Sequence, residues 1–382
     1  MQQADLEEVL ASVREFVRER VVPAEPEIAR TDEIPGWLRQ QSKDMGLFGF
    51  SIPEEYGGLG LSMAQEVRLV MELGYAAPAF RSMFGTNNGI AGHVLLESGT
   101  DKQRQEYLPL LASGEWTASF ALTEPEAGSD PGALTTKGTR SSSGAWVLNG
   151  TKRYITNAPI ADVFFVFART EAEPGPRGIS AFLVERDTPG LTVGAKDAKM
   201  GQAGAATADV FLDSAVVSAD HLIGAQGQGY ITAMKCLAHG RVHIAALCVG
   251  LAVRLVDESV RYAASRMQSG RAIGEFQLVQ GLLADSQTDL AAARGLVLET
   301  ARAFDSGEDV RMGPSCAKYF ASEAVFRIAD RAVQVHGGAG YMRDSAVERL
   351  FRDSRLFRLY EGTSQIQQVI IARELLRRVS EA

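Results

Sequence analysis

The tetrad Tyr360-Glu361-Gly362-Thr363 places one carboxylate on a predicted turn between two helical segments. Glycine gives the backbone the conformational freedom that such a turn requires, and a carboxylate held there is a candidate general base. The reaction that such a base serves is removal of a proton next to an activated carbonyl. A solvated loop carboxylate is the commoner fate of glutamate, so the tetrad taken alone favours that simpler interpretation.

Two further segments contain residue types that suit a polar, planar ligand. Phe120 to Asp130 ends a predicted strand with small and hydroxyl-bearing residues, which can present N–H and O–H groups to a ring. Gln334 to Tyr341 is rich in glycine, which allows a close backbone approach and positive φ. Each has a simpler explanation, a capped turn in the first case and a helix C-cap at Gly337 in the second. The glycine-rich segment does not lie between a strand and a helix, which argues against a Rossmann-type NAD site.

Composition argues against several classes of protein. The 382 residues are 46% hydrophobic and 23% charged, which suffices for two or three packed units. A net charge of −8 argues against non-specific nucleic-acid binding. The apolar stretch from Val242 to Val253 is predicted to be too short and too interrupted to cross a bilayer. The charged residues between Asp5 and Arg20 do not resemble a signal peptide. We therefore expect a cytoplasmic protein without a membrane partner.

Neither the cysteines nor the histidines show the spacing of metal ligands. Cys236, Cys248 and Cys316 form no CxxC pair, which is typical of reduced thiols. The five histidines are scattered along the chain, and we expect each to be solvated or hydrogen-bonded. No metal site is predicted.

The predicted secondary structure that positions the candidate catalytic and binding residues changes type twice along the chain. Apolar residues from Leu6 to Val17 recur at helical spacing, and helical sequence continues to about Leu111. From about Gly229 long helices return, each with an apolar stripe, as in a bundle.

The middle of the chain has the pattern of short strands. Residues 146–148, Asn149-Gly150 and residues 154–156 predict a β-hairpin with a type I′ turn, because Asn-Gly tolerates the positive φ of that turn. Further predicted strands are 163–168, 179–184 and 210–212. Short strands with turns between them indicate a small antiparallel barrel or sandwich.

Taken together and in this order, the segments resemble the acyl-CoA dehydrogenase family of flavoproteins over essentially the whole chain. The motifs that carry the resemblance are Thr123 to Asp130 (TEPEAGSD), Tyr154 to Asn157 (YITN), Gln334 with Gly337 to Tyr341 (GGAGY), and Tyr360 to Gln367 (YEGTSQIQ). The resemblance implies an α+β fold with three domains. They are an N-terminal helical domain over residues 1–116, a middle antiparallel β-barrel or β-sandwich domain over 117–226, and a C-terminal four-helix bundle domain over 227–382.

The resemblance also implies FAD, with its flavin ring between the β domain and the bundle. Leu122 and Thr123 would meet the flavin through backbone and hydroxyl groups, Tyr154 would cover the ring, and Thr156 would hydrogen-bond near flavin N5. The adenine half would reach a neighbouring subunit. The residues matched to that half or to other parts of the cofactor are Arg266, Gln277, Gln334, Gly337, Gly338, Thr363 and Gln365. Such shared sites imply a homo-oligomer, a tetramer built as a dimer of dimers.

By the same resemblance, Glu361 is the catalytic base of an α,β-dehydrogenation. Burial beside the acyl chain and the flavin should raise its pKa toward working pH. Its main-chain N–H and a flavin ribityl hydroxyl would stabilise the thioester oxygen as the α-proton leaves. The β-hydrogen would pass to flavin N5 as hydride, giving a trans-2-enoyl thioester, and an electron-transferring flavoprotein would reoxidise the flavin. The residues matched to substrate contacts are Ser129, Arg241, Tyr360 and Gly362.

Three positions refine or limit the resemblance. Some members carry the base one residue before the arginine matched by Arg241, but that residue here is Gly240, which leaves the role to Glu361. Gly240 also suggests room for a short or branched acyl group. Ala238 stands where many members have an aspartate that contacts the pantetheine of CoA, so an acyl group on a carrier protein is the alternative to CoA. Ser269 replaces a usual phenylalanine and weakens one expected FAD contact.

Two other functions compete with the dehydrogenase. An oxygen-using relative, either an acyl-CoA oxidase or a flavin monooxygenase, is the enzymatic alternative. The other is a binding or assembly subunit that keeps the fold without catalysis. The combined flavin and base motifs favour the dehydrogenase over both.

Overall fold

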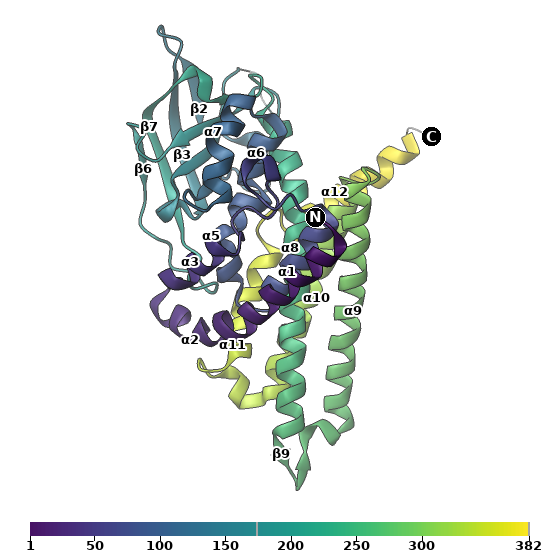
Figure 1. Ribbon diagram of the computed structural model, residues 1–382. Coiled ribbons are helices and arrows are strands. Elements are labelled where there is room, and N and C mark those ends of the chain that lie inside the picture. The colour runs from purple at the N-terminus through teal and green to yellow at the C-terminus, as the bar shows by residue number, and fades with distance from the viewer. Residues whose placement is uncertain (173–174, 381–382) are drawn as a thin grey trace.

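The computed structural model describes residues 1–172 and 175–380, and Figure 1 shows its three parts. The sheet lies at the upper left, long helices run down the right, and the N-terminal helices pack against both. These N-terminal helices are α1 (Gln3–Phe16), α2 (Val22–Thr31), α3 (Gly36–Asp44), α4 (Met63–Leu73), α5 (Pro78–Gly89), α6 (Ala91–Ser98) and α7 (Asp101–Ala112). A single π-helical turn, Val17–Val21, joins α1 to α2.

The middle of the chain forms one sheet with the order β6-β7-β3-β2-β4-β5-β8, and β1 pairs with β4. Its strands are β1 (Ala118–Ala121), β2 (Lys137–Arg140), β3 (Trp146–Thr156), β4 (Val163–Arg169), β5 (Ile179–Glu185), β6 (Leu191–Val193), β7 (Thr207–Val217) and β8 (Leu222–Ile223). Most pairs are antiparallel, as predicted, although β4 runs parallel to both β1 and β2. Strand β4 is buried on both faces, since alternate residues enter two different hydrophobic clusters.

The predicted hairpin at Asn149-Gly150 is wrong. Residues Trp146–Thr156 form the single strand β3, and the turn lies earlier, where the Ser141 N–H donates to the Ala145 carbonyl at 2.8 Å. Strand β7 pairs with β3 on both sides of Asn149, with a register shift between Leu148 and Gly150. Long-range strand pairing therefore overrides the local preference of Asn-Gly for a turn.

The C-terminal part is the predicted helical bundle. Its long helices are α8 (Gly229–Ser265), α9 (Gln277–Asp305), α10 (Met312–His336) and α12 (Ser364–Ser380), with the shorter α11 (Ala346–Ser354) before the last. A small hairpin of β9 (Met267–Gln268) and β10 (Arg271–Ala272) joins α8 to α9. Helix α10 contacts α8, α9 and α12, so it is the central member of the group.

Helix α8 corrects one expectation from the sequence. It has 37 residues, and by length and composition it is apolar enough to cross a bilayer. However, 89% of its most apolar window is buried inside the protein, as in the core helix of a soluble protein. Burial, and not insufficient length, is the argument against a membrane span.

Two glycines hold the N-terminal helices tightly against the bundle. A Cβ on Gly250 of α8 would lie 2.2 Å from the Met71 carbonyl oxygen, and one on Gly74 would lie 2.7 Å from the Leu247 carbonyl oxygen. The backbones of α8 and of the C-terminal end of α4 therefore touch directly. One continuous hydrophobic core contains residues of both helices. Helix α5, which follows α4 in the chain, also contacts α8.

Candidate functional site

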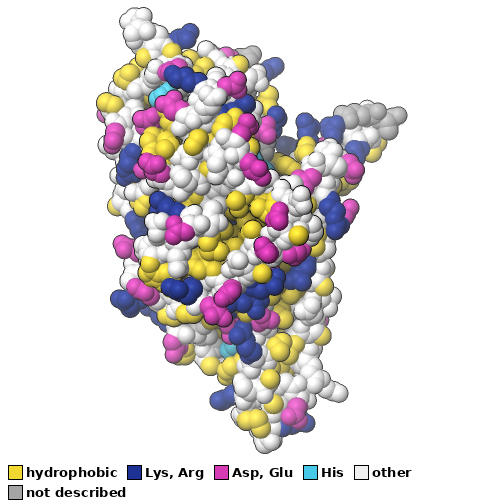
Figure 2. All heavy atoms as spheres, in the orientation of Figure 1, with side chains coloured by type: hydrophobic (Ala, Val, Ile, Leu, Met, Phe, Trp, Pro, Cys, Tyr) yellow, Lys and Arg dark blue, Asp and Glu magenta, His cyan; other side chains and the backbone are white. Residues whose placement is uncertain are grey.

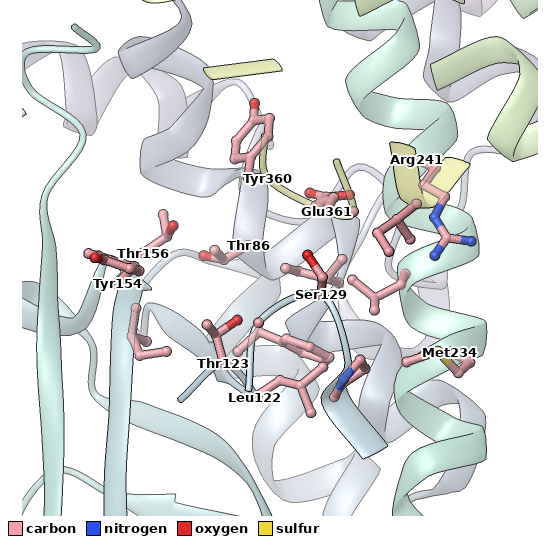
Figure 3. A pocket seen from close by; sticks show the side chains of 18 of the residues that line it. Thr86, Leu122, Thr123, Ser129, Tyr154, Thr156, Met234, Arg241, Tyr360 and Glu361 are labelled. Atoms are coloured by element: carbon pink, nitrogen blue, oxygen red, sulfur yellow. The ribbon is translucent and has the colours of Figure 1, made fainter. Parts of the chain in front are cut away.

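A cavity of about 710 Å³ lies where the three parts of the chain meet. Its walls come from α5, the loop after β1, the end of β3, α8, the turn at 360–362 and α12. Nine residues predicted from the sequence line it, namely Leu122, Thr123, Ser129, Tyr154, Thr156, Arg241, Tyr360, Glu361 and Gly362. Figure 3 shows Glu361 between Tyr360 and Ser129, with Arg241 on the adjacent helix α8.

Glu361 lies on a tight turn, as predicted. Its φ of 53° is in the left-handed region, which is unusual for a residue other than glycine, and Gly362 follows with φ 90°. Gln367 donates to the carbonyls of both residues, at 3.1 and 3.0 Å, and the buried Lys318 donates to that of Gly362 at 2.6 Å. Thr363 caps α12 by accepting the Ile366 N–H at 3.3 Å. The surrounding hydrogen bonds thus hold the strained conformation in place.

The Glu361 carboxylate lies at the cavity wall, and one of its oxygens lacks a hydrogen-bond partner. Its Oε2 is buried and has no hydrogen-bond partner among the described residues. Burial raises the pKa of Glu361 above its usual value, while the positive charges of Arg81, Lys318 and Arg241 oppose that rise. Within residues 1–172 and 175–380 the main-chain N–H of Glu361 also has no acceptor. A base and a free N–H donor therefore occupy the same turn.

Gly240 serves a different purpose from the one predicted. A Cβ at this position would lie 2.5 Å from Glu361 Oε2 and 2.6 Å from Ile90 Cγ2. The expected room for an acyl group is therefore already filled. Glycine is required here because the carboxylate of Glu361 lies against the α8 backbone.

The loop that carries Leu122 and Thr123 is fixed by a buried ion pair. Lys152 of β3 donates to Glu124 Oε1 at 2.8 Å and to the Leu122 carbonyl at 3.2 Å. Contact with Lys152 and further hydrogen bonds lower the pKa of Glu124 to about 2, against the opposing effect of burial. The Arg153 N–H donates to the Thr123 carbonyl at 2.9 Å, which ties the loop to the strand.

A planar polar ligand fits the wall formed by this loop and the end of β3. Tyr154 has φ 58° and is 63% exposed, so its ring is presented to the cavity instead of packing in the sheet. The Thr123 and Thr156 side chains line the same cavity. Asn157 donates to the Ser82 carbonyl and to Thr86 Oγ1, both at 2.9 Å, and so fixes α5 against this wall. An aromatic face flanked by hydroxyls suits the flavin of FAD.

The remaining predicted cofactor residues lie outside the cavity. Arg266, Gln277, Gln334, Gly337 and Gly338 are exposed, and they gather where α8 ends, α9 begins and α10 ends. The rings of Tyr262 and His336, 4.2 Å apart, join two of these helix ends. Thr363 and Gln365 lie beside the Glu361 turn but do not line the cavity. One chain thus presents two separate sets of predicted FAD-binding residues, one at the cavity and one at the ends of α8 and α10. This is the arrangement expected if FAD is shared between subunits.

The interpretation of the histidines as scattered is wrong. His239 and His243 lie one turn apart on α8, and both face the buried Glu66 of α4. Their ligand atoms lie within 4.8 Å of one another, and the His93 ring lies 3.6 Å from that of His239. The sequence signal was the spacing of four between His239 and His243, which places both on one helix face.

The contacts in this cluster favour a hydrogen-bonded chain over a metal site. His243 Nδ1 lies 2.9 Å from an Arg81 nitrogen, and Nε2 lies 2.5 Å from Glu66 Oε2. A guanidinium can only donate, so Nδ1 accepts and Nε2 carries the proton given to Glu66. Burial lowers the pKa of His243 to about 3, which keeps the ring neutral. Neither ring nitrogen is then free to bind an ion.

Charged side chains of both signs are dispersed over the molecular face in Figure 2, with an apolar area near its centre.

Three family models match the chain in series. They are the N-terminal domain of acyl-CoA dehydrogenase over residues 3–115, its middle domain over 119–215 and its C-terminal domain over 227–376. Among curated relatives, a 3-(aryl)acrylate reductase of Clostridium sporogenes and an acyl-CoA dehydrogenase of Bacillus subtilis are each 40% identical over 364 residues, which is 95% of this chain and 96% of theirs. A caffeyl-CoA reductase-Etf complex subunit of Acetobacterium woodii is 37% identical and covers 92% of this chain and 93% of its own.

Solved structures show the same fold. An acyl-CoA dehydrogenase from Bacillus anthracis complexed with FAD matches 100% of this chain and 68% of its own, at 32% identity and a TM-score of 0.94. The prolyl acyl carrier protein oxidase AnaB matches 98% of this chain and 100% of its own, at 32% identity and a TM-score of 0.93.

Proposed function

Because the chain belongs to the acyl-CoA dehydrogenase family, we propose that it is a flavoenzyme that oxidises the α,β bond of an acyl thioester, with Glu361 as the base for the α-proton. The observation that carries the proposal is the Glu361 carboxylate, which a strained turn places at the cavity wall and whose buried Oε2 has no hydrogen-bond partner among the described residues. A structural carboxylate at such a position would be expected to have a hydrogen-bond partner.

FAD is the cofactor that fits both groups of residues. Leu122, Thr123, Tyr154 and Thr156 would hold the flavin ring at the cavity wall. When bound, FAD accepts the β-hydrogen as hydride, which oxidises the acyl group. The second set of predicted FAD-binding residues, at the end of the bundle, would hold the adenine half of an FAD molecule whose flavin ring is bound by another copy of the chain. We therefore propose a homotetramer built as a dimer of dimers, which light scattering of the purified protein would test.

The protein's own groups account for the proton transfer. The carboxylate of Glu361 takes the α-proton, and the nearby charges of Arg81, Lys318 and Arg241 keep a fraction of it ionised despite burial. The main-chain N–H of Glu361 stabilises the negative charge that develops on the thioester oxygen. Because this donor and the base belong to one residue, the turn aligns both with the same substrate.

The direction of the reaction and the acyl carrier are part of the proposal. Three relatives are named as reductases or reductase subunits, and the same residues would return a proton to the α-carbon of an enoyl thioester in the reverse direction. We favour oxidation of a short or branched acyl-CoA, which the names of two further relatives support. An electron-transferring flavoprotein would be the electron acceptor, and the name of the Etf complex relative supports that acceptor. Ala238 and the similarity to AnaB support a carrier-protein thioester as the alternative.

The test is anaerobic reduction of the bound flavin by acyl thioesters. We expect the yellow colour to bleach with the wild-type protein and with Glu299→Gln, a control on exposed α9 surface. Glu361→Gln should still bind FAD but reduce it at least about 10³-fold more slowly, since the amide cannot act as the base. Bleaching by Glu361→Gln at the wild-type rate would refute the assignment of the base.

Two further results would refute the proposal more broadly. Rapid peroxide formation in air would identify an oxidase. A protein that cannot take up FAD would favour the binding subunit.

A further inference from the structure

The cavity contains a buried arginine whose hydrogen-bonding groups the proposed reaction does not use, although its positive charge acts on Glu361. Arg81 of α5 is 6% exposed and lines the cavity, and its Nε has no hydrogen-bond partner among the described residues. Burying a guanidinium is costly unless its donors are satisfied. A charge retained at such a place needs an explanation.

The local structure is shaped around this guanidinium. Arg81 lies over Gly85 and Gly89, one and two turns later on the same helix. A Cβ at Gly85 would lie 2.5 Å from Arg81 Nη1, and one at Gly89 would lie 3.0 Å from Nη2. Either position would crowd the guanidinium if it carried a side chain. The two glycines therefore form a cradle for Arg81.

A chain of hydrogen bonds holds the guanidinium from behind. Arg81 Nη2 donates to His243 Nδ1 at 2.9 Å, and His243 Nε2 donates to Glu66 Oε2 at 2.5 Å. His239 fixes the neighbouring turn of α8, because its Nδ1 lies 3.0 Å from the Gly89 carbonyl. Glu66 and His243 are 3% and 0% exposed, so the cavity side of Arg81 is the side left for a ligand.

The charge of Arg81 is not neutralised by contact. Within residues 1–172 and 175–380 no carboxylate forms an ion pair with it, since the neutral ring of His243 separates it from Glu66. The charged residues that line the cavity are Arg81, Arg241, Arg373, Asp130 and Glu361. Three cations face two anions, which leaves one positive charge in excess. Asp130 and Arg373 are exposed, whereas Arg81 and Arg241 are buried at the end of the cavity lined by α5 and α8.

A purely hydrocarbon acyl chain would leave this end of the cavity unsatisfied. It would displace water from the guanidinium without offering an acceptor, so Arg81 would keep an unpaired donor in an apolar contact. A carboxylate offers up to four acceptor positions and suits the fork of a guanidinium. Thr86 Oγ1 accepts from Asn157, which leaves its own hydroxyl proton for a ligand in the same cavity.

We propose that Arg81, held by His243 and Glu66, binds a carboxylate at the far end of the acyl group, so that the substrate is a thioester of a short dicarboxylic acid. This assignment rests on the proposed function, because it treats the cavity as the acyl site. Arg81 is then a specificity residue. Glu361 remains the base.

The experiment compares thioesters of equal chain length. Glutaryl-CoA and valeryl-CoA share a five-carbon acyl chain and differ in the terminal carboxylate. We expect kcat/KM for anaerobic flavin reduction to favour glutaryl-CoA by at least about 100-fold, because a site built for a polar group discriminates strongly against its absence. Arg81→Gln should lower this ratio by at least about 30-fold, chiefly through KM for glutaryl-CoA.

Variants of His243 separate positioning from folding. Glutamine can accept from Arg81 and donate to Glu66, so His243→Gln should keep most of the preference for glutaryl-CoA, whereas His243→Leu should lose it. Arg327→Gln, on α10 away from the cavity, is the matched control and should keep both the rate and the ratio. If Arg81→Gln does not fold, the two His243 variants still decide the question.

Each result has one meaning. A wild-type protein that is reduced by valeryl-CoA as fast as by glutaryl-CoA overturns the inference and leaves the proposed function standing. Equal loss toward both substrates in Arg81→Gln, with a shifted pH profile, would make Arg81 a counter-ion of Glu361 and also overturns it. If no acyl thioester bleaches the flavin, the proposed function itself fails.

Discussion

Replacing Gly240 by alanine tests whether the position of the Glu361 carboxylate controls the rate. The added Cβ would lie 2.5 Å from Glu361 Oε2 and 2.6 Å from Ile90 Cγ2, whereas ordinary contacts begin at 3.4 Å. The carboxylate must therefore withdraw by roughly 1 Å, a displacement that can lower the rate on the order of 10²-fold. We expect kcat/KM for flavin reduction to fall by that factor in Gly240→Ala, with FAD still bound.

Two comparisons make this prediction specific. Gly295 lies in α9 with nothing within 4 Å of a built Cβ, so Gly295→Ala should keep the wild-type rate and stabilise the protein by about 0.5–1 kcal/mol through helix propensity. Aspartate is one methylene shorter than glutamate, so Glu361→Asp withdraws the carboxylate from the added methyl group. The loss caused by Gly240→Ala should be much smaller in the Glu361→Asp background, which a double-mutant cycle measures.

The reasoning fails if Gly240→Ala retains more than about a third of the wild-type kcat/KM, since a 1 Å displacement of the base should cost far more. It also fails if the two substitutions are additive in the cycle. Thermal denaturation of each variant separates a displaced base from an unfolded protein.

Two further substitutions test the groups that hold the site. Lys318→Met removes the hydrogen-bond donor to the Gly362 carbonyl and a positive charge near Glu361. The pKa of Glu361 should therefore rise, and the acid limb of the pH profile of kcat/KM should move to higher pH. An unchanged pH profile would contradict this prediction. The same variant should change the free energy of unfolding by no more than about 2 kcal/mol, because loss of a hydrogen bond is offset by removal of a buried cation whose pKa is lowered to about 8. Glu124 has a pKa of about 2, below its usual 4.5, so its contribution of about 3 kcal/mol is present above pH 4.5 and is lost as the pH falls toward 2. Glu124→Gln should therefore be less stable at neutral pH and lose less stability on acidification, as urea unfolding at a series of pH values would show; equal acid sensitivity would argue against the ion pair with Lys152.

The sequence alone predicted the parts of the site that lie on short local motifs. The Glu361 turn, the loop with Leu122 and Thr123 and the exposed Tyr154 all line one cavity, as the resemblance implied. Each is a loop or a strand end whose residue types can be read along a short stretch of sequence. Taken alone, the two loop motifs favoured simpler interpretations, and the resemblance of the whole series of motifs to one family assigned the roles.

The residues missed by sequence reasoning depend on contacts between distant segments. Arg81 and Lys318 look like ordinary charged residues until the structure places them against the cavity and the Glu361 turn. The histidine cluster joins α8 to Glu66 of α4, and only the spacing of His239 and His243 was visible in advance. Burial of a polar side chain is a property of the packed molecule, and one sequence gives little information about it.

The same limit explains the two errors of local interpretation. Asn149-Gly150 has the composition of a turn, but pairing along β7 keeps it within a strand. Gly240 suggested open space, but the absent side chain is matched by a carboxylate from a residue 121 positions later in the chain. In both cases a distant segment supplied the constraint.

The contact between Gly74 and Gly250 has a consequence for exchanging parts of this chain with those of relatives. Each glycine is required by the backbone opposite it, at 2.7 and 2.2 Å, so the two positions form a matched pair across the boundary between the N-terminal helices and the bundle. A chimera that takes α4 from one relative and α8 from another would assemble correctly only if both parents keep glycine at these positions. Recombination within the family is therefore restricted at this helix crossing, independently of any residue that contacts the substrate.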